Sequence, residues 1–168
     1  FFYAFMVIYT PIYLHEYIGF GWDKIGIMFS IMLLPFVILD FPLGKISDKI
    51  GEKELLITGF SVMTLSVLAI PFIREPIFLL WAFVLFITRV GAATVETMSE
   101  AYFFKVISER NSNIIAFFRG TSSLSYIIAP VVTSVFLLLV PSFKYIFFVL
   151  AAIILTGLFT VLSIKDVR

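Results

Sequence analysis

The chain has 168 residues, of which 61% are hydrophobic and 14% are charged, and its net charge at pH 7 is +1. A soluble domain carries about 25% charged residues, so this composition argues against a water-soluble protein and predicts an all-α membrane protein. The small net charge excludes a nucleic-acid partner. The lack of cysteine in the sequence excludes disulfides, thiolate metal sites and cysteine nucleophiles.

Six apolar stretches have or approach the roughly 20 residues that are needed to cross a bilayer. The predicted transmembrane helices cover residues 1–18, 24–46, 54–73, 76–104, 112–140 and 144–164. Glycine, proline and charged residues mark the joints between them. The first stretch is short and begins inside an apolar run, so we expect a truncated helix in a piece of a longer protein. Residues 1–168 are expected to form one six-helix transmembrane domain.

Lysine and arginine are distributed unevenly between the short joints. The side that receives the second joint, the fourth joint and the C-terminus holds Lys45, Lys49, Lys53, Lys105, Arg110, Lys165 and Arg168. The other side holds Lys24, Arg74 and Lys144. Because positive residues favour the cytoplasmic side, we expect both chain ends in the cytoplasm and the protein in the plasma membrane.

The predicted helices also differ in polarity. The interiors of the third and sixth contain only hydroxyl-bearing polar residues, so we expect these helices to be outermost and to face lipid. The fourth and fifth contain charged side chains, which are costly in a bilayer and rarely face lipid. We therefore expect the first and fourth helices to face a central cavity, in a bundle of two three-helix repeats.

Three charged residues of the fourth predicted helix lie on one stripe. Arg89, Glu96 and Glu100 are seven and four residues apart, which places them within about 40° of one another around the helix axis. Arg89 could bind an anionic or polar solute, and Glu96 could carry a coupling proton. Alternatively, these residues form structural charge pairs that lock helices together, and we favour that interpretation for Glu100.

Further polar residues mark the first two predicted helices. Tyr9, Thr10 and Tyr13 surround Pro11, where their hydroxyls could line a cavity or anchor the helix at an interface. Asp40 lies on the second helix, on a stripe directed toward the same interior. It could titrate there, or it could pair with a lysine.

Residues 44–53, between the second and third predicted helices, read GKISDKIGEK. Gly44 permits close helix approach, Asp48 can accept hydrogen bonds at a helix end, and Gly51 permits a tight turn. Lys49 and Lys53 would hold the cytoplasmic face. The stretch could be an ordinary solvated loop. Its order of glycine, aspartate, basic residue, glycine and basic residue also resembles the signature of the major facilitator superfamily.

This resemblance extends into the fourth predicted helix. The segment 89–91 is similar to the arginine-containing motif of that family, and Glu100, Lys105 and Arg110 resemble its charged cluster after the fourth helix. The resemblance implies one six-helix half of a secondary transporter that moves a small solute by alternating access, with proton coupling as one option. It implies no cofactor, and its partners are the lipid bilayer and the missing half. The short charged end at 164–168 favours the C-terminal half.

The same signature predicts a charge network at the cytoplasmic end. Asp48 ends the second predicted helix, Glu100 approaches that level on the fourth, and Arg119 lies about 10 Å into the fifth. Together with Lys49 and Lys53, these residues are expected to latch the outward-facing state. The alternative is a helix-end aspartate of local structural use only.

Two other classes of function stay open as alternatives. A channel or scaffold could be built from six helices, but nothing in the sequence resembles a filter loop or a pore-lining ring. An intramembrane enzyme would need a nucleophile with a buried base. The single histidine, His15, lies at the predicted membrane edge, and the sequence has no Gly-x-Ser-x-Gly elbow. We therefore expect neither an enzyme nor a metal site.

Overall fold

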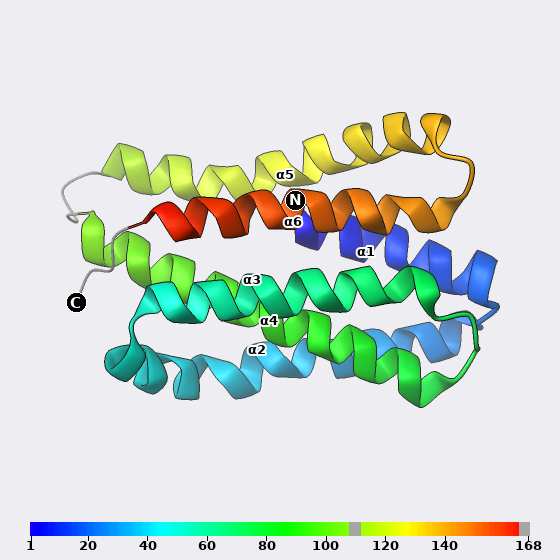
Figure 1. Cartoon of the computed structure of the whole chain (residues 1–168), viewed down its shortest axis with the longest axis horizontal. Coiled ribbons are helices and arrows are strands. Elements are labelled where there is room, and N and C mark those ends of the chain that lie inside the picture. The colour runs from blue at the N-terminus through cyan, green and yellow to red at the C-terminus, as the bar shows by residue number, and fades with distance from the viewer. Residues whose placement is uncertain (108–111, 165–168) are drawn as a thin grey trace.

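The computed structural model describes residues 1–107 and 112–164, and this part of the chain is helical apart from short joints. The α-helices are α1 (Phe2–Tyr13), α2 (Trp22–Ile50), α3 (Glu52–Ala69), α4 (Phe78–Val106), α5 (Ser112–Leu139) and α6 (Ile146–Ser163). Three short turns join them: the π-helix η1 (Leu14–Ile18) and the 3₁₀ turns η2 (Ile70–Phe72) and η3 (Phe143–Tyr145). The long helices run roughly parallel or antiparallel to one axis of the molecule (Figure 1). The prediction of an all-helical protein is confirmed.

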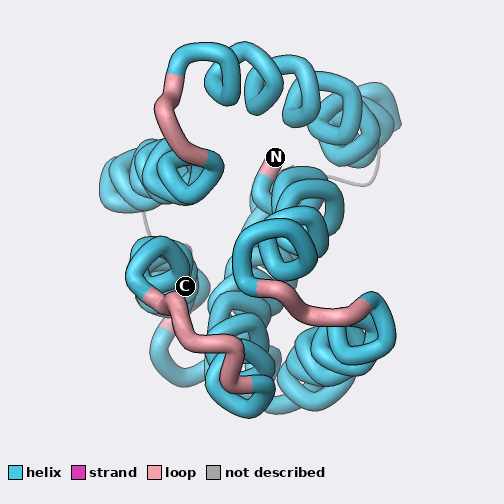
Figure 2. Tube along the Cα trace, turned by 90° about the vertical axis from the view of Figure 1, so that its right-hand side faces the viewer, coloured by secondary structure: helices cyan, strands magenta, loops and turns pink. Residues whose placement is uncertain are grey.

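Five of the helices, α2 to α6, are long and apolar enough to cross a membrane. The first is different, because α1 and η1 together cover only residues 2–18. At 1.5 Å per residue this is about 25 Å, short of the roughly 30 Å of hydrocarbon in a bilayer. Both views place the N-terminal residue within the bundle rather than at one of its ends (Figures 1 and 2). The count of six spans and the repeat architecture stay predictions.

The joint between the second and third helices is tighter than the sequence predicts. The predicted helices 24–46 and 54–73 leave a loop over residues 47–53, but α2 runs to Ile50 and α3 begins at Glu52. Gly51, with φ of 95°, makes the whole turn, and its amide still donates to the carbonyl of Ser47 at 2.9 Å. The signature stretch from Gly44 to Ile50 is therefore helix and not loop, because one glycine with positive φ is enough to reverse the chain.

Helix α4 lies between α2 and α3, and α3 packs in turn against α6. The α3–α4 contact is a backbone approach at two glycines. A Cβ on Gly91 would lie 2.8 Å from the carbonyl oxygen of Gly59, and a Cβ on Gly59 would lie 3.0 Å from that of Gly91. Small residues allow helices to meet this closely in a membrane. The large buried side chains Phe5, Met28, Trp81 and Phe147 fill the main core between α1, α2, α4 and α6.

In this bundle the order of the helices by polarity differs from their order by burial. In the most apolar window of α3, 44% of the residues are buried, whereas in α5 the value is 11%. A helix without charges can pack against neighbours on one side and face lipid on the other, so hydropathy alone does not distinguish the two. That the third and sixth helices are outermost stays a prediction.

Candidate functional site

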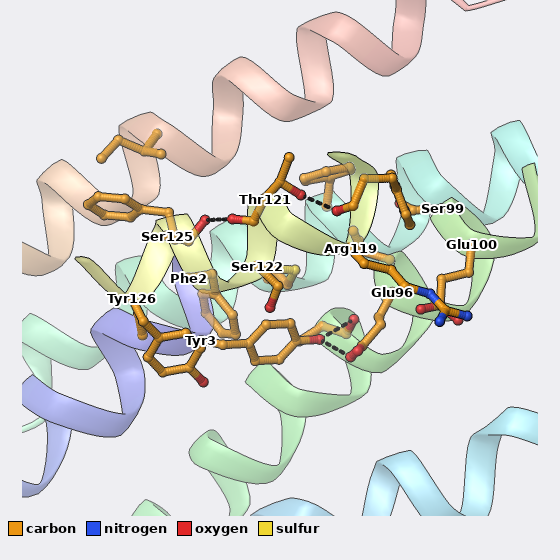
Figure 3. Close-up of a pocket in the computed structure, with 18 residues that line it drawn as sticks. Phe2, Tyr3, Glu96, Ser99, Glu100, Arg119, Thr121, Ser122, Ser125 and Tyr126 are labelled. Atoms are coloured by element: carbon orange, nitrogen blue, oxygen red, sulfur yellow. Dashed lines mark hydrogen bonds between the residues drawn. The ribbon is translucent and has the colours of Figure 1, made fainter. Parts of the chain in front are cut away.

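A cavity of about 480 Å³ lies between α1, α4 and α5, with side chains of α3 and α6 at its back. Its wall combines aromatic rings with polar side chains from three helices. The polar groups include Tyr3 on α1, Glu96, Ser99 and Glu100 on α4, and Arg119, Thr121, Ser122, Ser125 and Tyr126 on α5. Figure 3 shows these side chains gathered around one space. This volume is within the range of about 300–1,000 Å³ that is usual for small-molecule sites.

Tyr3 fixes the position of Glu96. Its hydroxyl lies 2.7 Å from Glu96 Oε2 and 3.0 Å from the carbonyl oxygen of Ala92, so one proton is shared between two acceptors on α4 (Figure 3). The contact joins residues that are 93 positions apart in the chain. It holds the carboxylate at the cavity wall and ties the start of α1 to α4.

Glu100 and Arg119 occupy the other end of the cavity. In Figure 3 the Arg119 side chain extends from α5 toward this end, where Glu100 lies on α4. Among the residues that the structure describes, no N···O distance within 4.0 Å joins the two groups. Opposite charges on two helices that border one cavity can approach when the helices move together.

Arg89 lies behind this wall. It is 1% exposed, and its guanidinium carbon sits 5.4 Å from the ring centroids of both Phe2 and Tyr3, within the range of a cation–π contact. Within the described part of the chain its Nε and Nη2 atoms have no hydrogen-bond partner. Because two rings separate Arg89 from the cavity, its placement favours the interpretation in which it holds helices together.

The polar residues of α1 and α2 that the sequence singled out, Tyr9, Thr10, Tyr13 and Asp40, lie outside the cavity wall. Tyr9, Thr10 and Tyr13 are buried in the core; the Tyr9 hydroxyl donates to the carbonyl of Pro130 on α5 at 3.1 Å. Asp40 accepts a hydrogen bond from Thr97 Oγ1 at 2.8 Å, which links α2 to α4 in place of the lysine pairing considered above.

The predicted cytoplasmic network is not assembled in this structure. Asp48 and Lys49 are exposed, and Lys53 Nζ instead donates to the carbonyls of Leu162 at 3.1 Å and Ile164 at 2.7 Å, at the end of α6. Across residues 1–107 and 112–164, no ion pair joins any two of Asp48, Lys49, Lys53, Glu100 and Arg119. A lysine at the last carbonyls of a helix is favourable, because these carbonyls lack partners within the helix.

The ion pair at this end involves a residue that the sequence reasoning missed. Glu52 is 1% exposed, and its Oε1 accepts from Lys105 Nζ, so α3 is bound to α4. Glu52 stands at a position of the signature where any residue is allowed, so the sequence predicts an exposed side chain there. Its spacing could have revealed it, because Leu55 and Leu56, three and four residues later on the same helix face, are buried.

A bundle of membrane-length apolar helices around a cavity with charged walls defines a multi-pass integral membrane protein. The family model described as Major Facilitator Superfamily matches residues 1–167, and the chain belongs to this family of transporters. The resemblance carried by residues 44–53 is thereby confirmed at the level of the family. No curated protein and no solved structure gives a significant match to the chain.

Proposed function

We propose that this chain is one half of a secondary active transporter, which moves a small solute across a membrane by alternating access. The observation that carries the proposal is the cavity between α1, α4 and α5. It places two carboxylates and a guanidinium on the wall of a cavity in a bundle of mostly apolar helices. Charge in such surroundings is costly, and in membrane proteins it marks solute and ion pathways.

The proposal includes a second six-helix half that closes the cavity, as in transporters built from repeats. We infer that the present chain is the C-terminal half, that it consists of two three-helix repeats, and that both its ends face the cytoplasm from the plasma membrane. The lysine-rich end of the bundle around the signature supports this orientation. Glu96 is the candidate for carrying a coupling proton, because its carboxylate lies on the cavity wall.

The second part of the proposal concerns switching between states. We infer that Asp48, Lys49 and Lys53 close on Glu100 and Arg119 when the cytoplasmic end is shut. The bonds from Lys53 to the end of α6 and from Glu52 to Lys105 support this, because they show that charged side chains at this end already bridge helices. Breaking a fully buried charge pair costs about 3–5 kcal/mol, and the smaller cost for a partly buried pair is still enough to reweight two conformations that differ by a few kcal/mol.

Exchange in proteoliposomes tests the transporter. The full-length protein is reconstituted with a panel of labelled cations, sugars, amino acids and carboxylates, and uptake is measured with and without solute inside. Saturable uptake that is accelerated by internal solute is expected for at least one class. Glu96→Gln should slow it at least about tenfold, the equivalent of 1.4 kcal/mol. Glu75→Gln, which changes an exposed carboxylate in the α3–α4 joint, is the matched control.

A channel would give uptake that does not saturate and is not accelerated by internal solute. That result, or the absence of uptake for every class in the panel, would overturn the transporter proposal.

A further inference from the structure

The charges on the cavity wall are unequal. Its lining includes the carboxylates of Glu96 and Glu100 and the guanidinium of Arg119. Glu100 lies toward the end of the cavity to which the Arg119 side chain extends, so these two charges can offset each other, and Glu96 has no ion-pair partner within 4.0 Å in the described part of the chain. Its Oε2 is engaged by the neutral hydroxyl of Tyr3. Summed over the two carboxylates and the guanidinium, the lining side chains have an excess of one negative charge.

Arg89 is the other cation near this carboxylate, but it cannot contact a solute in the cavity. Its side chain is 1% exposed, and the rings of Phe2 and Tyr3 cover it on the cavity side. Arg89 can stabilise the charge of Glu96 through space while leaving the cavity face of that carboxylate open. The Glu96 side chain is exposed, so a cation can approach its carboxylate to hydrogen-bond distance, where charge-assisted contacts are strongest.

The rest of the wall combines aromatic rings and apolar side chains with the hydroxyls of Ser99, Thr121, Ser122 and Ser125. Six aromatic rings line the cavity, from Phe1, Phe2, Tyr3, Phe60, Phe118 and Tyr126. Aromatic faces carry negative electrostatic potential and attract cations, and their area binds apolar groups. An anion of the same size would meet the Glu96 charge and these ring faces unfavourably. A neutral sugar could bond to the hydroxyls of the wall but would bring no positive charge to Glu96.

We propose that the cavity takes a lipophilic organic cation of single positive charge, with its charged centre against Glu96 and its apolar groups against the rings. This assignment of substrate class rests on the proposed transport function. Arg119 is then a specificity-determining residue of opposite sign, because it lowers the affinity for a cation while it offsets Glu100.

A pair of probes with nearly the same shape and opposite charge tests this assignment. Tetraphenylphosphonium is the cation and tetraphenylborate is the anion. Binding of labelled tetraphenylphosphonium and of labelled tetraphenylborate to the purified full-length protein is measured in separate samples in mild detergent, each with its own unlabelled form as competitor, because the two ions precipitate together when mixed. The cation should bind saturably, and the borate should not.

Three variants test whether the site prefers a positively or a negatively charged ligand. Glu96→Gln should weaken binding of the phosphonium at least about tenfold, Glu75→Gln should leave it unchanged, and Arg119→Gln should tighten it about threefold. If the cavity bound an anion instead, Arg119→Gln would weaken binding of the ligand rather than tighten it. This variant therefore distinguishes the two assignments. Saturable binding of the borate, or unchanged affinity for the phosphonium in Glu96→Gln, overturns the cation assignment.

The reconstituted exchange assay separates the two proposals. If another solute class is exchanged and the phosphonium does not bind, the substrate class is wrong while the transporter proposal stands. If no class is exchanged, the transport function itself is overturned.

Discussion

Helices α4 and α5 form opposite walls of the same cavity, but they are held in different ways. Helix α4 is packed between α2 and α3 and meets α3 backbone to backbone at Gly59 and Gly91. Helix α5 packs mainly against α1, and 11% of the residues in its most apolar window are buried. One wall of the site thus belongs to a tightly packed group, and the other to a helix with few contacts inside the chain.

This difference bears on how such a site can open and close. Glu96 on α4 is fixed by its helix and by the hydroxyl of Tyr3. Arg119 and Tyr126 are carried by α5, and its link to α1 includes the hydrogen bonds of the Tyr9 hydroxyl to the carbonyl of Pro130 and to Ser134 Oγ. Moving α5 would break few interactions within the chain, whereas moving α4 would separate two helices that touch along their backbones.

The largest effect is expected where the packing is closest. Gly91→Val would place side-chain atoms against the carbonyl of Gly59 and the backbone of Met63, so the helices must separate. We expect a loss of about 3 kcal/mol in the free energy of unfolding. Thermal unfolding in detergent measures it. Gly120→Ala on α5 is the control, because a Cβ there meets nothing within 4 Å. Equal destabilisation by both variants would refute the contrast between the two helices.

The next effect concerns the ion pair between α3 and α4. Lys105→Met leaves the buried Glu52 carboxylate without this cation, and we expect a loss of about 2 kcal/mol in the free energy of unfolding. The value is below that of a fully buried pair because Lys105 is 44% exposed. Adding Glu52→Gln should recover much of the loss. A double variant that is as unstable as the sum of the single variants would show that the pair has no coupling energy.

The third prediction concerns a contact between the tightly packed group of α2, α3 and α4 and the helix α5. The proposed latch would join Asp48 on α2 to Arg119 on α5. Asp48→Asn in the full-length protein should slow exchange about tenfold while expression and solute binding stay close to the parental values. Initial rates and equilibrium binding of the same solute measure the two effects. Exchange at the parental rate with normal expression would mean that Asp48 has a local structural use only.

The smallest effect is expected for the contact that holds α5. Tyr9→Phe removes the hydroxyl that donates to Pro130 and should cost about 1 kcal/mol in the free energy of unfolding. Hydrogen exchange of α5 amides should rise, and exchange of α4 amides should not change. A uniform rise in both helices would show that α5 is no less firmly held than α4.

The sequence alone determined that this is a membrane protein, the approximate extent of its helices and its family. Hydropathy, turn glycines and the signature at residues 44–53 are local properties of the chain, because each can be judged from a short window. The helix ranges predicted at 76–104 and 112–140 are thus within two residues of α4 and α5 as the structure has them. The tight turn also depends on a local property, because the positive φ of Gly51 is enough to reverse the chain.

The tertiary structure alone decided which polar side chains meet. Arg89, Glu96 and Glu100 share a stripe in the sequence, but the rings of Phe2 and Tyr3 separate the first from the cavity that the other two line. The partners of Glu96, Asp40 and Glu52 lie from 53 to 93 residues away in the chain. Such pairings depend on how each helix is rotated about its axis, and that rotation is set by close packing against neighbours that no local window contains.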